Sequence, residues 1–185
     1  MLAVDTSNFY KLLHPRPAVV IISKCREGRL NAMTASWVTP LSEEPPTVAF
    51  AIDREAYTNE CLSYCNELTI NIPDVSQVDV VYALGTVSGR EVDKVRKYKL
   101  RLGKSEAIEV PYWSDALGSL ECRVLKEVDV GEVTLYIAQV LKVWVREGSF
   151  GRWGWDLGRF KPLHHVIGRA FTSPAHRKVL AKRVE

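Results

Sequence analysis

Long hydrophobic runs are missing from this sequence. No apolar segment approaches the ~20 residues that a membrane-spanning helix requires, and the first residues lack the basic-then-apolar order of a secretory signal peptide. Glutamine occurs only at Gln77 and Gln139, a scarcity typical of thermophile proteins. These absences predict a cytoplasmic protein with no membrane partner.

Concentrated charge is missing as well. The net charge of +3 is weak, and its sources are dispersed except between His176 and Arg183. Nucleic-acid binding requires a concentrated basic stripe, so we expect no nucleic-acid partner. The 185 residues, 46% apolar and 25% charged, are typical of one globular domain that buries a sizeable core.

Cysteine is sparse. Cys25, Cys61, Cys65 and Cys122 do not form a disulfide framework by number or spacing. Cys61 and Cys65 share one face if their segment is helical. They are either two small buried apolar side chains or a redox pair, and both interpretations stay open. Further ligands are missing nearby, so we expect no zinc site and no other metal.

Nucleotide-binding and hydrolytic fingerprints are missing too. The glycines of the segment 85–90 have the spacing of neither a P-loop nor a dinucleotide-binding loop. No Ser/His/Asp or Cys/His set marks a nucleophile. A pyridine nucleotide must therefore bind transiently in an open cleft, and any difficult chemistry is left to a cofactor.

Short apolar runs between turn signals make up most of the chain. They predict strands at 19–22, 30–38, 47–52, 67–72, 120–124 and 133–145, with hairpin turns at 27–28 and 131–132. Thr58 and Ser76 are the predicted N-caps of two helices, 58–66 and 76–85, and the charged segment 91–99 predicts a solvated helix. We expect a mainly β fold, an antiparallel barrel with short helical insertions.

Two groups of residues could bind a flat, phosphorylated ligand. The segment from Asn31 to Pro40 carries small residues and hydroxyls, which let a planar ring approach backbone N–H groups; alternatively it is an edge strand and turn. Arg54, Thr58 and Asn59 precede or open a predicted helix, and Ser88, Arg90 and Lys94 add further donors for a phosphate. Otherwise these cations are solvated charges.

Three segments resemble, in their order, the flavin reductase-like family of FMN-binding split barrels, which includes flavoredoxins and archaeal ferric reductases. They are Asn31–Trp37, Ser88–Lys94 and Lys161–Gly168. The resemblance spans about Pro15 to Phe171, so we expect an N-terminal arm over 1–14, the domain over 15–171 and a basic helical tail over 172–185. It implies an antiparallel split β-barrel and a homodimer with FMN bound between subunits.

The resemblance also implies roles for single residues. Thr34 to Trp37 would present backbone groups to the isoalloxazine, and Arg54, Tyr57 and Thr58 would approach the phosphate. Ser88 to Arg90 would complete the pocket. No protein residue is predicted to be catalytic, because flavin N5 would accept the hydride. The complete predicted cofactor-binding set is Asn31, Thr34, Ala35, Ser36, Trp37, Arg54, Tyr57, Thr58, Asn59, Ser88, Gly89, Arg90, Lys94 and His165.

The implied function is electron transfer from NADH or NADPH through flavin to a free flavin, ferric iron or a similar acceptor. Many members of the family carry a histidine where this chain has Val133, so a role for a histidine there is lost. Three alternatives remain: a flavoredoxin-like electron carrier with protein partners, a non-catalytic FMN-binding protein, and, because of the basic tail, a cofactor-free RNA- or partner-binding barrel.

Overall fold

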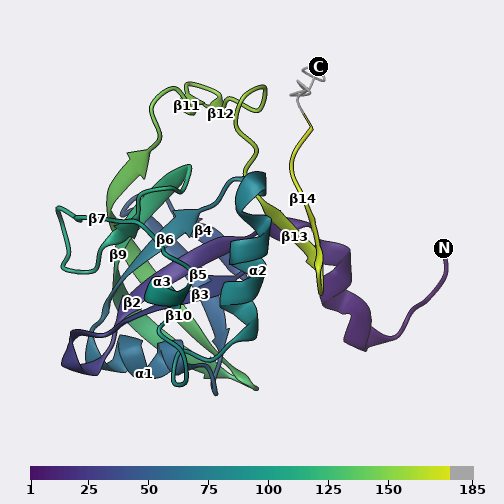
Figure 1. The fold of residues 1–185 in the computed structure, drawn as a ribbon. Helices are drawn as coiled ribbons and strands as arrows, with labels where there is room; N and C mark the ends of the chain where they lie inside the picture. Colours follow the sequence, from purple (N-terminus) through teal and green to yellow (C-terminus); the bar gives the residue numbers. More distant parts are fainter. Residues whose placement is uncertain (176–185) are drawn as a thin grey trace.

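The β-branched and apolar runs form one antiparallel sheet of seven strands. The computed structural model describes residues 1–175 (Figure 1). The strand order is β3–β2–β6–β9–β10–β5–β4, which confirms the prediction of a mainly antiparallel β fold. The bounds are β2 Val19–Lys24, β3 Leu30–Ala35, β4 Val38–Ser42, β5 Thr47–Asp53, β6 Glu67–Ile72, β9 Gly118–Val130 and β10 Val133–Val145.

The two edge strands of this sheet, β3 and β4, are consecutive in the sequence. Only Ser36 and Trp37 separate them, so the sheet must curl until its edges meet. The N–H of Ala51 on β5 donates to the carbonyl of Trp37 at 2.9 Å, which holds this link in place. The prediction of one strand over 30–38 was therefore wrong, because closure of the barrel breaks that segment at Ser36. We call this link, Ser36–Trp37, the seam.

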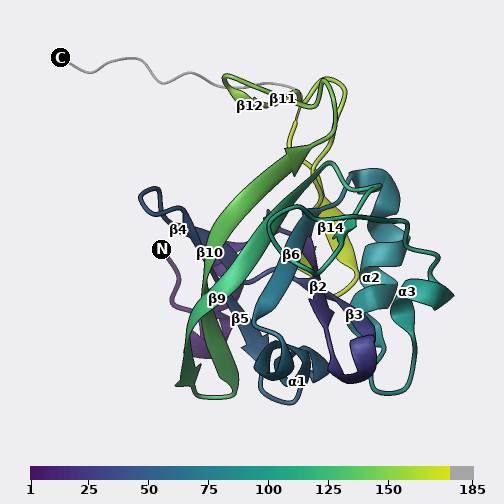
Figure 2. The ribbon, with the colours of Figure 1, turned by 90° about the vertical axis from the view of Figure 1, so that its left-hand side faces the viewer.

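The β9–β10 hairpin is the longest part of the sheet and crosses the whole barrel (Figure 2). Its turn at Gly131 adopts φ +56, a left-handed conformation that favours glycine. The pairing register shifts between Ile137 and Ala138 and again between Val140 and Lys142. Such irregularities increase local bending and twist, as a closing barrel requires.

Strand β2 separates two apolar cores. Side chains alternate between the faces of a strand, so Val19 and Ile21 pack in one cluster with Phe50 and Ile70. Ala18, Val20 and Ile22 pack in the other cluster, against α2 (Val78–Thr86). The fully apolar run of β2 therefore reflects burial on both faces, as predicted.

Helix α1 (Tyr57–Tyr64) covers one end of the barrel (Figure 1). The prediction that Thr58 is its N-cap was wrong: the cap position belongs to Ala56, whose side chain makes no capping hydrogen bond. Thr58 lies inside the first turn and is 1% exposed. Its hydroxyl bonds to neighbouring side chains rather than to the backbone of the helix.

The other helix caps also differ from the predicted ones. Asp74, not Ser76, caps the short 3-10 helix η3 (Val75–Gln77) through a capping box with Gln77, and α2 (Val78–Thr86) follows directly. The predicted helix over 91–99 shrinks to α3 (Lys94–Lys97), which Asp93 caps by accepting from Arg96 N–H. This segment is not simply solvated, because Lys94 is buried.

Short elements complete the described chain. A three-stranded sheet of order β1–β13–β14 lies beside α2, and the β11–β12 hairpin lies at the opposite end of the barrel from α1 (Figure 1). The predicted helical tail over 172–185 is not helical through Ala175, where Thr172 ends β14, and its remainder lies outside the described residues. The remaining bounds are η1 Thr6–Leu13, β1 Arg16–Pro17, η2 Arg26–Gly28, β7 Leu102–Gly103, β8 Tyr112–Trp113, β11 Phe150–Gly151, β12 Gly154–Trp155, β13 His164–Ile167 and β14 Ala170–Thr172.

The cysteines depart from expectation. Cys25, after β2, forms a disulfide with Cys61 on α1, and both side chains are buried. The expectation of no disulfide framework missed this bond, because tertiary folding brings Cys61 to a partner 36 residues away. Cys61 and Cys65 are not a redox pair, and of these two only Cys61 is fully buried. Cys65 and Cys122 are free thiols. Burial raises the pKa of Cys122 to about 12, which keeps that thiol unreactive at neutral pH.

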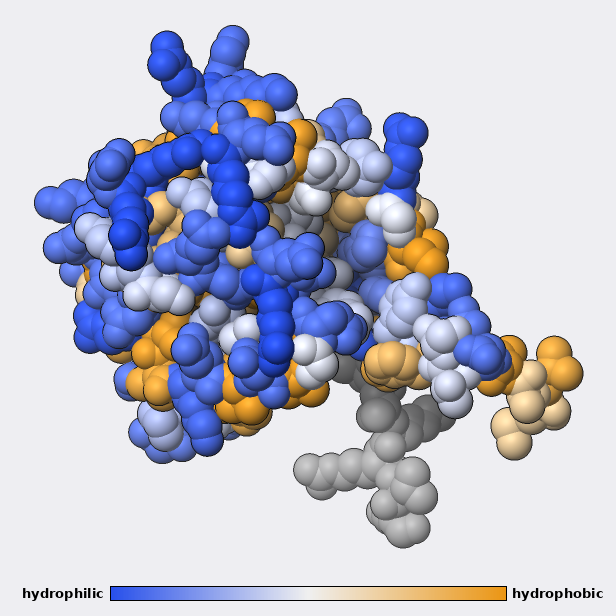
Figure 3. All heavy atoms as spheres, turned by 90° about the horizontal axis from the view of Figure 1, so that it is seen from below, coloured by the Kyte–Doolittle hydropathy of each residue, from blue (hydrophilic) through white to orange (hydrophobic). Residues whose placement is uncertain are grey.

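The described surface is mainly hydrophilic on the side seen from below in Figure 3, with small apolar patches between charged side chains. The N-terminal arm projects from the body and exposes Met1, Leu2 and Phe9. Among the described residues, none of the helices combines the length and the apolar character that crossing a membrane requires.

Candidate functional site

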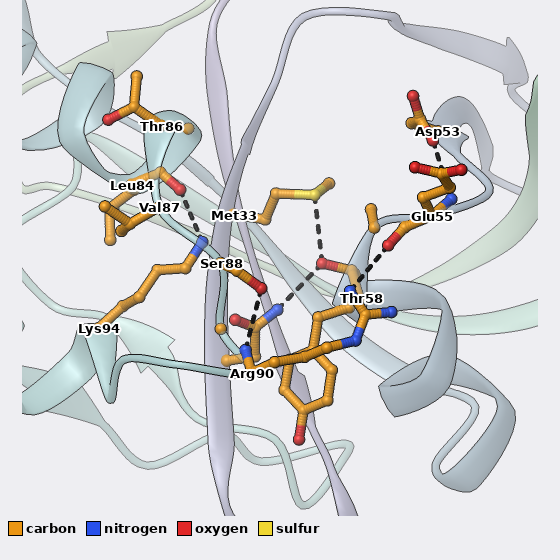
Figure 4. Close-up of a pocket in the computed structure, with 15 residues that line it drawn as sticks. Met33, Asp53, Glu55, Thr58, Leu84, Thr86, Val87, Ser88, Arg90 and Lys94 are labelled. Atoms are coloured by element: carbon orange, nitrogen blue, oxygen red, sulfur yellow. Dashed lines mark hydrogen bonds between the residues drawn. The ribbon is translucent and has the colours of Figure 1, made fainter.

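A pocket of about 390 Å³ opens between β3, the start of α1 and the loop after α2 (Figure 4). We call it the polar pocket. Seven predicted site residues line it together: Asn31, Tyr57, Thr58, Ser88, Gly89, Arg90 and Lys94. The carboxylates of Asp53 and Glu55 also lie in its wall, so its charge is mixed.

The α1 side of the polar pocket is built on Asn31. Its Nδ2 donates to the Thr58 hydroxyl at 3.0 Å, and that hydroxyl donates to the Met33 sulfur at 3.2 Å. Asn31 Oδ1 is buried and accepts no hydrogen bond within the described part of the chain. A buried acceptor without a partner costs about 1–3 kcal/mol.

The opposite wall approaches Asn31 very closely at Gly89. A Cβ at position 89 would lie 2.1 Å from Asn31 Oδ1 and 2.7 Å from Tyr57 Cδ1. Arg29 holds this loop by donating to the Gly89 carbonyl at 2.6 Å. Only glycine fits here without displacing the pocket wall.

Two guanidinium groups lie over the Tyr57 ring. Arg29 is 5.7 Å and Arg90 5.5 Å from its centroid. Arg90 also donates to Glu60 and, at 2.9 Å, to the Glu55 carbonyl. These contacts orient Arg90 and give the pocket wall a positive face beside the aromatic ring.

Lys94 closes the polar pocket from below α2. Its Nζ donates to the Leu84 carbonyl at 2.7 Å, near the C-terminal end of that helix (Figure 4). The residue is 3% exposed, and burial lowers the pKa of Lys94 to about 8. Near pH 8 the Lys94 amine is therefore only partly protonated, and a nearby anion favours the protonated form.

A second pocket of about 270 Å³ adjoins the first, because Gly85 and Thr86 line both. We call it the aromatic pocket. Its wall combines the small residues at the end of β3 with rings and glycine from α2, β13 and β14. The predicted residues Thr34, Ala35, Ser36 and His165 line it, together with Tyr82 and Phe171. Thr34 donates to the Val81 carbonyl, which fixes β3 against α2.

Three predicted residues lie elsewhere. Trp37 points to the other side of the seam, into a separate pocket with Leu13 and Arg16. Arg54 pairs with Asp129 at 3.1 Å and does not line the polar pocket. Asn59 donates to the carbonyls of Asp53 and Arg54 and accepts from the Tyr136 hydroxyl, so it secures the start of α1.

Sequence reasoning missed Arg29, Tyr82 and Phe171. Arg29 lies next to the predicted turn at 27–28 and looks like an ordinary surface cation, and Tyr82 and Phe171 look like core residues. Only the pairing of distant segments brings Tyr82 and Phe171 into the aromatic pocket and Arg29 to the Gly89 carbonyl behind the polar pocket. Among residues 1–175, no group of three or more His, Cys, Asp or Glu side chains is placed to hold a metal ion.

Comparisons with known proteins identify a domain family and relatives of this chain. The sequence model of the flavin reductase like domain matches residues 11–166. An uncharacterized protein from Archaeoglobus fulgidus is 32% identical over 91% of this chain and 94% of its own length. The reductase component of a 4-nitrophenol 4-monooxygenase/4-nitrocatechol 2-monooxygenase from Rhodococcus opacus is 23% identical over 90% and 87%.

The fold also matches solved structures. The crystal structure of an FMN-binding protein from Thermus thermophilus with bound 1-cyclohex-2-enone is 26% identical, with a TM-score of 0.83 and 98% coverage of both chains. The split-barrel architecture expected from the three sequence segments is thereby confirmed. The chain belongs to the flavin reductase-like family.

Proposed function

We propose that this protein binds FMN across the two adjoining pockets and uses it to transfer electrons from NADH or NADPH to an acceptor. The observation that carries this proposal is the junction at Gly85 and Thr86. It joins a pocket with cations and hydroxyls to one with small and aromatic walls. FMN likewise consists of two parts, a phosphorylated ribityl chain and a flat isoalloxazine ring.

The residues fit this cofactor. Thr58, Ser88, Arg90 and Lys94 are hydroxyl and cationic donors of the kind that hold a phosphate. Arg54 and Asn59 then act indirectly, by securing the segment that leads into α1.

When bound, FMN supplies a ring that accepts a hydride and releases electrons. The protein would position that ring. Thr34 to Ser36 and Gly85 leave room for a planar ring, and the Tyr82 and Phe171 rings line the same space. Binding between two subunits is part of the proposal, and the exposed apolar arm with Phe9, Leu12 and Leu13 supports it as a surface for a second copy.

An absorbance spectrum of the purified protein tests the proposal directly. We expect flavin bands near ~450 nm, retained or restored with added FMN, that bleach under anaerobic NADH or NADPH. Bands that bleach only with dithionite would favour the flavoredoxin-like carrier. A protein that binds no FMN when it is supplied would contradict the proposal.

The low pKa of Lys94 predicts a pH dependence of FMN affinity. Free Lys94 loses its proton above about pH 8, whereas a phosphate beside it favours the charged form. Binding above pH 8 then takes up a proton, so affinity falls as pH rises, by up to ~10-fold per unit. Fluorescence titrations between pH 7 and 9.5 measure this slope.

Lys94→Met should bind FMN more weakly at pH 7 and show little slope. Lys97→Met is the matched control, because Lys97 is an exposed cation on the same helix. If wild-type affinity is constant across this range, or if Lys97→Met removes the slope, Lys94 is not the phosphate contact.

A further inference from the structure

Ser36 and His165 are joined by a hydrogen bond whose direction is fixed by a third group. His165 Nε2 lies 3.2 Å from the Gly168 carbonyl oxygen, which can only accept, so Nε2 carries the hydrogen. In a neutral imidazole the other nitrogen, Nδ1, then has a free lone pair. Ser36 Oγ lies 3.3 Å from Nδ1 and therefore donates to it.

The backbone places both groups in the aromatic pocket. Ser36 lies in the seam, where the backbone leaves the β3 ladder, and its side chain points away from the pocket of Trp37. Gly168 adopts φ +52 in the turn between β13 and β14, which brings its carbonyl back to the His165 ring. His164, the preceding residue, lines a different pocket with Trp155.

We propose that Ser36 and His165 form a proton-transfer pair for an organic acceptor that is reduced against the flavin ring, beside the aromatic pocket in which that ring is proposed to lie. This inference rests on the proposed function. Reduction of such an acceptor by NAD(P)H consumes one solvent proton in addition to the hydride: NAD(P)H + H⁺ + A gives NAD(P)⁺ + AH₂. Ser36 delivers that proton, and His165 replaces it.

The proton balance closes on the two side chains. The Ser36 Oγ–H bond breaks as a new N–H or O–H bond forms on the reduced acceptor. The imidazolium of His165 gives its Nδ1 proton to Ser36 Oγ and returns to the neutral tautomer held by Gly168. Solvent then reprotonates Nδ1, and the two electrons come from the nicotinamide hydride.

The titratable groups that face His165 come from β1, from the N-terminal arm and from α2. Arg16 on β1 lies opposite His165 in the strand register. The His14 ring contacts the His165 ring at 5.5 Å between centroids, and burial, then Arg16, then His165 lower the pKa of His14. Tyr82 shares the pocket and lies under Arg169. None of these named neighbours is a carboxylate.

A purely structural bond between the seam and β13 would predict different results. It would affect stability and cofactor affinity, whereas a proton-transfer pair affects turnover and its pH dependence. The decisive variants are Ser36→Ala, Ser36→Thr and His165→Gln. His164→Gln is the matched control, because that ring lies outside the aromatic pocket.

Two measurements test the pair. In the apoprotein, ¹⁵N spectra of the imidazoles should show His165 protonated at Nε2, with an Nδ1 resonance that shifts in Ser36→Ala. In steady state with free riboflavin as acceptor under anaerobic conditions, Ser36→Ala should lower kcat by about 10²-fold. FMN affinity should stay within about threefold of wild type, since uncharged hydroxyl contacts contribute modestly.

The controls complete the design. Ser36→Thr should restore kcat to within about tenfold of wild type, because the hydroxyl is kept, and His165→Gln should remove one limb of the pH–kcat profile. A Ser36→Ala kcat within threefold of wild type, an unchanged profile in His165→Gln, or a neutral His165 imidazole protonated at Nδ1 instead of Nε2 would each overturn the pair. Failure of the proposed function is seen separately, as wild-type protein that binds no FMN.

Discussion

Reduction of the disulfide between Cys25 and Cys61 is expected to lower the free energy of unfolding by about 4 kcal/mol. The bond closes a loop between residues 36 apart, and loss of that constraint on the unfolded chain gives this value in the chain-entropy model. It ties the turn after β2 to α1, whose first turn forms part of the polar pocket. The reduced protein should therefore also bind FMN less tightly.

Urea unfolding with and without dithiothreitol measures the change. The double variant Cys25→Ala/Cys61→Ala is the control, because it should not respond to the reductant. Alkylation of the unfolded protein should find two free thiols before reduction, Cys65 and Cys122, and all four cysteines after it. Four reactive thiols in the unreduced, unfolded protein would show that the bond does not form.

The disulfide also bears on the predicted cytoplasmic location, which stays a prediction. Disulfides are rare in the cytosol of mesophiles but common in intracellular proteins of hyperthermophiles. Scarce glutamine fits the same kind of source. The bond and a cytoplasmic location are therefore compatible in a thermophile.

Gly89→Ala is expected to weaken FMN binding by about ten- to hundredfold. The added Cβ would collide with Asn31 Oδ1 and Tyr57 Cδ1. Asn31 cannot easily move away, since it is 3% exposed and bonded to Thr58. Overpacking of this kind costs about 1–3 kcal/mol, and here the displaced atoms belong to the ligand pocket.

Fluorescence titration with FMN measures this loss, and a double-mutant cycle tests its cause. Asn31→Ala removes the nearest colliding atom, so the double variant should lose less affinity than the sum of the single variants. Gly151→Ala is the matched control, because a Cβ at that position meets nothing within 4 Å. Additive losses, or equal losses in Gly151→Ala, would show that close approach at Gly89 is not the reason.

The sequence was sufficient for what depends on local pattern. The β-branched runs predicted the strands of the sheet well, and β2 was correctly assigned to a core on both faces. Helix starts were less predictable. In the sequence Thr58 is a good N-cap residue, but in the fold its hydroxyl is buried beside Asn31 and hydrogen-bonded to that side chain. The strand order depends on closure of the barrel, which no local pattern encodes.

Most of the candidate pocket residues were found through the three family-like segments rather than through residue chemistry. Arg54 illustrates the limit, because a cation before a helix suggests a phosphate contact until the fold pairs it with Asp129. Arg29 illustrates the converse, since its contact with Gly89 joins residues 60 apart. The predicted domain limits and the individual ligand contacts stay predictions.

The seam has a consequence for local motion. Edge strands β3 and β4 bond to a neighbour on one side only, so separating them breaks no ladder hydrogen bond between them. Local opening follows the regions with the fewest such bonds. The barrel should therefore widen most easily between β3 and β4 away from Ser36–Trp37, where the chain itself joins the two strands. Asn31 and Met33 of β3 line the polar pocket, so a ligand bound there should hold β3 in place, and amide hydrogen exchange along β3 would slow when it binds.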